Sequence, residues 1–187
     1  MVIVFGGSFN PPTRAHLEII KKLLNTFEDS TVLVLPVGND YKKSELIDFK
    51  HRFEMLKRLT KNIDRVIISD LEAHKTYNGT LGSLSELSKS YNDLYFVTGA
   101  DNLNTFDTWI SYEKLLKSYP FIIMTRKSGL TQEDAEHMFA PYEHNFTYIP
   151  FEMDIQSSDI RKMVKKHQKD LTDEVFQYIQ ENHLYGV

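Results

Sequence analysis

The chain has 187 residues, of which 41% are hydrophobic and 26% charged, and this length and composition predict one core-forming domain, residues 1–187. The net charge of −4 disfavours general nucleic-acid binding. The chain contains no cysteine, which excludes disulfides, thiolate catalysis and cysteine-ligated zinc. No apolar run is long enough to span a membrane and no signal pattern opens the chain, so we expect a cytoplasmic protein without a membrane partner.

Short apolar runs that predict buried strands alternate with segments of helical periodicity along the chain. The predicted strands are 2–5, 31–35, 65–69, 94–98, 121–125 and 146–149. The predicted helices are 15–27, 49–59, 80–90, 109–117, 131–138, 158–167 and 172–182. This alternation predicts an α/β fold with a doubly wound, Rossmann-like parallel sheet, followed by a small helical tail at about residues 155–187.

The string GGSFNPPTRAH, from Gly6 to His16, connects the first predicted strand to the first helix. Glycines let a ligand approach the main chain, and free N–H groups at a helix start attract phosphate. Thr13 adds a hydroxyl, and His16 adds an imidazole that can donate a hydrogen bond or carry positive charge. A T-x-x-H pair alone is more typical of an ordinary helix start, so the whole string carries the prediction. Neither G-x-G-x-x-G nor G-x-x-x-x-G-K-[ST] occurs in the chain.

Three features of the middle of the chain add to this site. The charged loop 37–48 is the most irregular stretch, so we expect it to form a mobile lid. Gly99 and Asp101 follow the fourth predicted strand, where a carboxylate can accept hydrogen bonds from ribose hydroxyls. Trp109, the single tryptophan, fits equally a core position on an amphipathic helix and a platform for a flat ligand.

The string IQSSDIRK, from Ile155 to Lys162, suggests a second anion-binding element. Ser157 or Ser158 can cap the helix that follows, and Arg161 can turn back toward the same point. Hydroxyl, N–H and guanidinium groups would then meet on one anion, a task that suits the geometry of arginine. For this string alone, a plain helix cap is the simpler interpretation.

The first string resembles the G-x-F-x-P-x-[HT]-x-G-H motif of the nucleotidyltransferase superfamily, and the second resembles its I-S-S-T-x-I-R motif. The resemblance implies that His16 stabilises the transferring phosphate, with Thr13 and Arg161 as further catalytic residues. It also implies an ATP-binding set, which is Gly7, Ser8, Phe9, His16, Gly99, Asp101, Ser157, Ser158 and Arg161.

Within this superfamily the run G-x-D-x₇-W, from Gly99 to Trp109, is similar to the nicotinate mononucleotide adenylyltransferases. Arg52 in RFEML and the ending VFQYIQENHLY extend that similarity. It implies transfer of the adenylyl group of ATP to nicotinate mononucleotide, giving deamido-NAD and pyrophosphate. Mg²⁺ would bind mainly through the ATP phosphates, without a dedicated protein metal site. The implied mononucleotide-binding residues are Lys43, Tyr77, Asn78, Trp109 and Arg126.

The chain departs from the family pattern at Thr13, Ala15 and Gln156, and in KTYNGTL at 75–81, the loop with which the family recognises the nicotinate carboxylate. Two alternatives therefore stay open: a pantetheine-phosphate adenylyltransferase, and a nucleotide-binding regulatory module without catalysis. The preference between nicotinate and nicotinamide, and assembly into a homo-oligomer, stay open as well.

Overall fold

A computed structural model describes residues 1–41, 45–126 and 129–187 of the chain. These residues form a six-stranded sheet in the order β3-β2-β1-β4-β5-β6, and all neighbouring strands are parallel. The strands are β1 Val2–Gly7, β2 Thr31–Pro36, β3 Val66–Ile68, β4 Leu94–Gly99, β5 Phe121–Thr125 and β6 Phe146–Pro150. The predicted doubly wound parallel sheet is confirmed. The strand order reverses between β1 and β4, and ligands bind at the carboxyl ends of strands at such a switch point.

The α-helices are α1 Arg14–Thr26, α2 Phe49–Thr60, α3 Gly79–Leu87, α4 Tyr112–Ser118, α5 Gln132–Phe139, α6 Ser157–Lys162 and α7 Asp173–Glu181. Short 3₁₀ helices are η1 Leu71–Ala73, η2 Ala100–Thr108, η3 Gln168–Asp170 and η4 Leu184–Gly186. Threonine side chains cap α1, α5 and α7 by accepting a main-chain N–H from the first turn. Such caps satisfy donors that have no partner within a helix, so they fix where these helices begin.

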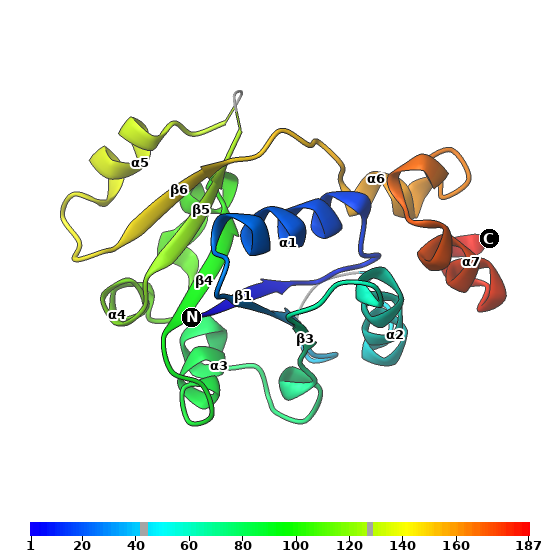
Figure 1. Ribbon diagram of the computed structural model, residues 1–187, viewed down its shortest axis with the longest axis horizontal. Helices are drawn as coiled ribbons and strands as arrows, with labels where there is room; N and C mark the ends of the chain where they lie inside the picture. The colour runs from blue at the N-terminus through cyan, green and yellow to red at the C-terminus, as the bar shows by residue number, and fades with distance from the viewer. Residues whose placement is uncertain (42–44, 127–128) are drawn as a thin grey trace.

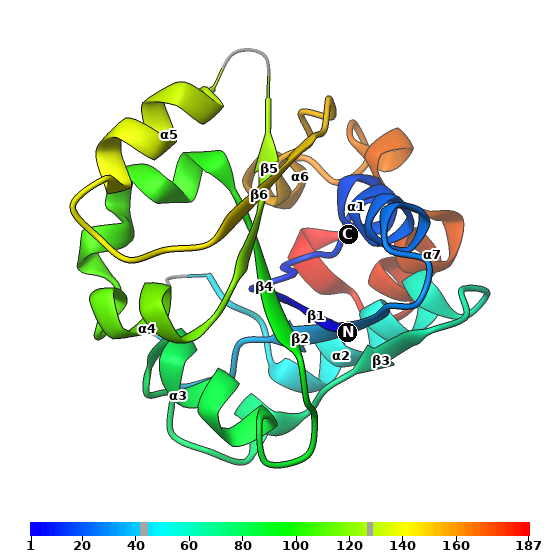
Figure 2. The same ribbon diagram turned by 60° about the vertical axis from the view of Figure 1, so that its left-hand side comes forward.

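The sheet separates two apolar cores, one on each face (Figure 1 and Figure 2). Along β1 the side chains alternate: Ile3 and Phe5 pack with α1, α2 and α7, and Val4 packs with α3, α4 and α5. Figure 2 shows α1 and α7 to the right of β4 and α3, α4 and α5 to its left. Because both faces are covered, the strands read as continuous apolar runs.

Two predicted helices differ from the structure. The predicted helix 109–117 begins only at Tyr112, because Trp109 is extended and packs on Phe106 at the end of η2. The predicted helix 158–167 ends at Lys162, because Met163 leaves the helical conformation and Val164 enters the core beside α1. In both places burial of a side chain overrides local helix propensity.

Candidate active site

The predicted corner lies at the carboxyl end of β1, where Gly7 ends the strand and Thr13 begins α1. A Cβ on Gly7 would lie 3.1 Å from the ring of Phe9, so glycine permits this close packing. Phe9 is 1% exposed and packs edge-on against Phe5 and His16, so its side chain is closed to a ligand. Of this predicted ATP-binding residue, only the main chain can face the site.

His16 is held by its own helix cap. Its Nδ1 accepts a hydrogen bond from the main-chain N–H of Thr13 at 2.9 Å and lies 2.9 Å from the Thr13 hydroxyl. A main-chain N–H can only donate, so Nδ1 carries no proton and the neutral ring is protonated at Nε2. Desolvation against Phe5 and Phe9 lowers the pKa of His16 to about 4. At pH 7 the corner therefore holds a neutral imidazole with one N–H donor, at Nε2.

The second motif docks onto this corner. Ser157 donates its hydroxyl hydrogen to the carbonyl of Pro11 at 2.8 Å, and Arg161 Nη1 donates to the carbonyl of Asn10 at 2.8 Å. The structure thus brings together the segments of His16 and Arg161, as expected. The expected serine cap is wrong: α6 begins one residue earlier, so Gln156 occupies the cap position without a side-chain cap bond. Ser158 lies half-buried in the first turn of α6.

The guanidinium of Arg161 also contacts the loop after β2. Its Nε and Nη2 donate to Oε2 of Glu45 at 3.3 Å and 3.2 Å. The Glu45 carboxylate is 71% exposed, whereas the Arg161 side chain is 15% exposed. A carboxylate and a phosphate suit the same two-pronged guanidinium contact, so Arg161 has the geometry of an anion-binding group.

The predicted ribose side of the site lies at the ends of β4 and β5. Gly99 ends β4 and Asp101 follows it in η2, with its side chain exposed. Arg126 follows β5, and its Nη1 lies 3.2 Å from Asp154 and 3.9 Å from Asp101. Because β1, β4 and β5 are parallel neighbours, these residues share the sheet edge of the corner.

The other predicted mononucleotide residues lie on separate connections. Trp109 is half-buried, with its indole stacked on Phe106 at 4.6 Å between ring centroids, so it combines a core contact with an exposed part. Tyr77 packs edge-on against Tyr41 at 4.9 Å, and Asn78, at the start of α3, is exposed. Lys43 lies outside the described residues.

Two buried charged side chains lie beside the corner, and the sequence predicted no contact with the corner for either of them. Arg52 is 0% exposed and donates from Nε to the Ile47 carbonyl and from Nη1 to the Ser8 carbonyl, both at 3.0 Å. Glu72 is 6% exposed and accepts from the Ser83 hydroxyl at 2.7 Å, and burial raises the pKa of its carboxyl. Within the described part of the chain, Nη2 of Arg52 and Oε2 of Glu72 have no hydrogen-bond partner. Arg52 thus ties the loop after β2 to the corner.

Sequence reasoning also missed Asn10, Glu45 and Tyr185. Asn10 stands inside the first motif and Tyr185 inside the similar ending, but neither was predicted as a site residue. Their contacts join segments 35 to 175 residues apart, which local patterns do not reveal.

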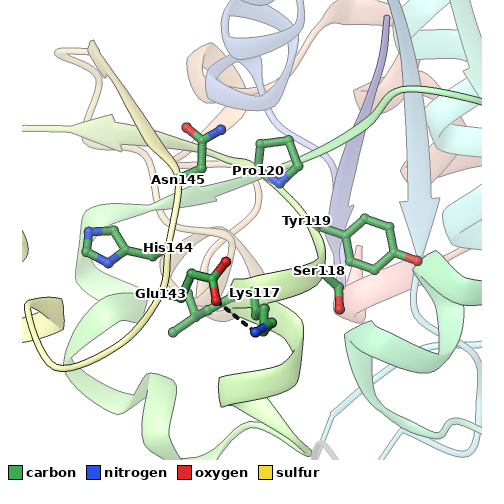
Figure 3. Close-up of a pocket in the computed structure, with 8 residues that line it drawn as sticks. Lys117, Ser118, Tyr119, Pro120, Glu143, His144 and Asn145 are labelled. Carbon is green, nitrogen blue, oxygen red and sulfur yellow. Dashed lines mark ion pairs between the residues drawn. The ribbon is translucent and has the colours of Figure 1, made fainter.

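Two hollows lie away from the corner. A cavity of about 150 Å³ lies at the amino ends of β5 and β6, beside the Lys117–Glu143 ion pair (Figure 3), on the opposite edge of the sheet. A larger one of about 550 Å³ is lined mainly by α2, α7 and the segment after β3. Neither includes a predicted site residue, so both are separate from the candidate site.

Over 1–41, 45–126 and 129–187, no cluster of three or more His, Asp or Glu side chains could hold a metal ion. The helices in those ranges are too short or too polar to cross a membrane.

A family model described as cytidylyltransferase-like matches residues 4–163. The chain belongs to the cytidylyltransferase-like family. It is 44% identical, over 99% of its length and 97% of the relative, to a "probable nicotinate-nucleotide adenylyltransferase" of Acholeplasma laidlawii. A relative of the same description from Caldicellulosiruptor bescii is 32% identical over 88% of this chain and 87% of its own length. Within the family, the chain belongs with the nicotinate-nucleotide adenylyltransferases.

A solved structure supports the same grouping. The Plasmodium falciparum nicotinic acid mononucleotide adenylyltransferase complexed with NaAD matches with a TM-score of 0.81 and 27% identity. The match covers 98% of this chain and 96% of that one. The whole architecture, including the helical tail, is therefore shared with that protein.

Proposed function

We propose that the chain transfers the adenylyl group of ATP to nicotinate mononucleotide, releasing deamido-NAD and pyrophosphate. The observation that carries the proposal is the convergence of the His16 corner with Ser157 and Arg161, which join it through the carbonyls of Pro11 and Asn10. Relatives described by this activity span the chain, and the solved neighbour is named with its dinucleotide NaAD.

The proposed reaction needs no general base. The phosphate of the mononucleotide is already an anion at neutral pH, so one of its oxygens can form a bond to the α-phosphorus of ATP. The bond between that phosphorus and the bridging oxygen breaks, and pyrophosphate leaves with the electron pair. The protein then contributes alignment and charge stabilisation, which dominate catalysis of phosphoryl-type transfer.

His16 has the form that this role requires. Its Nδ1 is occupied by the N–H of Thr13, so Nε2–H is the donor available to an oxygen of the transferring phosphate. A fixed neutral donor needs no proton transfer and no reorientation during the reaction. Thr13 positions the ring, and Arg161 contributes the positive charge that the neutral imidazole lacks.

Arg126 and Trp109 are proposed to bind the acceptor, together with Tyr77, Asn78 and Lys43. Arg126 is 36% exposed at the end of β5 and is paired with two aspartates, so its cation can be shared with a phosphate. The exposed part of Trp109 suits a flat, electron-poor ring such as pyridine.

Mg²⁺ is proposed to accompany ATP. The described residues of the corner offer carbonyl and hydroxyl oxygens but no cluster of carboxylates that could hold a metal ion. This composition fits an ion held by phosphate oxygens and water. When bound, the ion would neutralise triphosphate charge. A cytoplasmic location and a single domain over residues 1–187 belong to the same proposal.

Pyrophosphate release from ATP tests the function with nicotinate mononucleotide, nicotinamide mononucleotide and phosphopantetheine as acceptors. We expect the highest kcat/KM with nicotinate mononucleotide. Faster turnover of phosphopantetheine would identify the alternative adenylyltransferase. ATP binding without pyrophosphate release for any acceptor would identify a regulatory module.

A further inference from the structure

The last residues of the chain reach the active-site corner. The hydroxyl of Tyr185 donates a hydrogen bond to Oδ1 of Asn10 at 2.7 Å, across 175 residues of sequence. Asn10 is 2% exposed, so its amide depends on protein partners. Burial raises the pKa of the Tyr185 hydroxyl far above its ordinary value, so the group stays a donor at neutral pH.

Asn10 connects three distant segments. Its Nδ2 donates to the main-chain carbonyl of Glu45 at 2.8 Å, and its own main-chain carbonyl accepts from Arg161 Nη1 at 2.8 Å. The Glu45 carbonyl can only accept, so it sets the orientation in which Nδ2 faces Glu45, and Oδ1 then faces the Tyr185 hydroxyl, which donates to it. Tyr185 thus supplies the second side-chain hydrogen bond that holds Asn10, the residue whose carbonyl anchors Arg161.

The backbone around Tyr185 adopts a conformation that side chains normally avoid. His183 and Tyr185 have φ angles of 51° and 55°, in the left-handed region. Non-glycine residues keep such angles when surrounding contacts determine them, and they cluster at functional sites. The contact with Asn10 is one such determinant.

We propose that Tyr185 is a positioning residue for ATP, acting through Asn10 on Arg161. The inference rests on the proposed function for the identity of the nucleotide. Tyr185 itself touches no reacting atom in this scheme. It holds the Asn10 carbonyl where Arg161 can face the triphosphate.

The test is Tyr185→Phe, which removes one hydroxyl and keeps the ring. Tyr178→Phe is the matched control, because Tyr178 lies in the same tail and its hydroxyl bonds His51 at 3.0 Å, away from the corner. We expect Tyr185→Phe to raise the ATP Kd from calorimetry, and the KM for ATP, about tenfold, because the buried Asn10 oxygen loses its donor. The kcat at saturation should stay within about twofold of wild type, because the variant loses the same binding free energy in the ground state and in the transition state.

A double variant tests the route through Asn10. In an Asn10→Ala background, Tyr185→Phe should leave the ATP Kd unchanged, because the two residues act as one unit. Additive effects would overturn the route. An unchanged Kd in Tyr185→Phe, or an equal rise in Tyr178→Phe, would overturn the proposal. The ATP Kd is measured without an acceptor, so it tests the role of Tyr185 separately from the transfer reaction. Wild-type protein that binds ATP but transfers nothing would contradict the proposed function alone.

Discussion

The most informative single residue is His16, because its environment defines its chemistry. Its Nδ1 is used by the helix cap, and desolvation keeps the ring neutral. The motif predicts the residue and its place at the phosphate. The motif does not predict the protonation state, because that depends on Phe5 and Phe9 packed around the ring.

The first prediction concerns turnover. His16→Ala should lower kcat about 10²–10³-fold, because it removes a donor to developing charge. The ATP Kd should change less than about threefold, since that donor acts mainly in the transition state. Steady-state kinetics and calorimetry measure the two quantities. His74→Ala, at an exposed histidine paired with Asp70, is the control. A loss of ATP affinity as large as the loss in kcat would contradict the assignment.

The second prediction concerns pH. The unfolded chain protonates His16 near pH 6.5, whereas the folded protein does so only at about 4. The contribution of the neutral ring to stability is therefore complete above pH 6.5 and is lost as pH falls toward 4, by about 1.4 kcal/mol per pH unit. Urea unfolding of wild type and His16→Gln from pH 7 to 4.5 measures the difference in the free energy of unfolding. Parallel curves for the two proteins would show that His16 does not cause it.

At the scale of elements, connections rather than strands differ from expectation. Each predicted strand overlaps an observed one, because β-branched runs covered on both faces leave little choice of structure. The helices at 109–117 and 158–167 were wrong in extent, since Trp109 and Val164 turn toward a core that sequence periodicity does not display. The contacts of Arg161 with Glu45 and of Tyr185 with Asn10 were not predicted from the sequence for the same reason, because they depend on the path of the chain in space.

The third prediction tests how the loop after β2 meets η1. A Cβ on Gly38 would lie 2.2 Å from the main-chain oxygen of Glu72, and a main-chain atom cannot rotate away. Gly38→Ala should therefore cost about 2–3 kcal/mol of unfolding free energy, as overpacking does. Gly99→Ala is the matched control, because a Cβ there meets nothing within 4 Å. Urea denaturation compares them, and equal midpoints would refute the steric argument.

At the scale of the whole molecule, the helical tail is part of the main core. Val175 and Ile179 of α7 are 0% exposed and belong to the cluster formed with β1, α1 and α2. Trp109 packs on the other cluster, across the sheet. The two clusters share the six strands, so we expect them to unfold together.

The fourth prediction uses that arrangement. Ile179→Ala should destabilise the protein by about 2–4 kcal/mol, because it leaves a cavity in a full core. The fluorescence of Trp109 and far-UV circular dichroism should report the same lowered midpoint. Gln180→Ala, exposed on the same helix, should leave both midpoints unchanged. If the midpoint of the Trp109 fluorescence transition is the same in Ile179→Ala as in wild type, the tail unfolds as a separate unit.

The all-parallel strand order has a consequence for redesign. The four departures from the family pattern, Thr13, Ala15, Gln156 and KTYNGTL, all lie outside the strands, at helix starts or in connections. The strands form the buried scaffold, and the proposed site residues lie at strand ends, in the adjoining helices and in connections. Because the KTYNGTL segment is proposed to bind the acceptor, exchange of residues 75–78 should change acceptor choice, whereas Gly79 and Leu81 pack against Ile110 and the apolar core and would be kept.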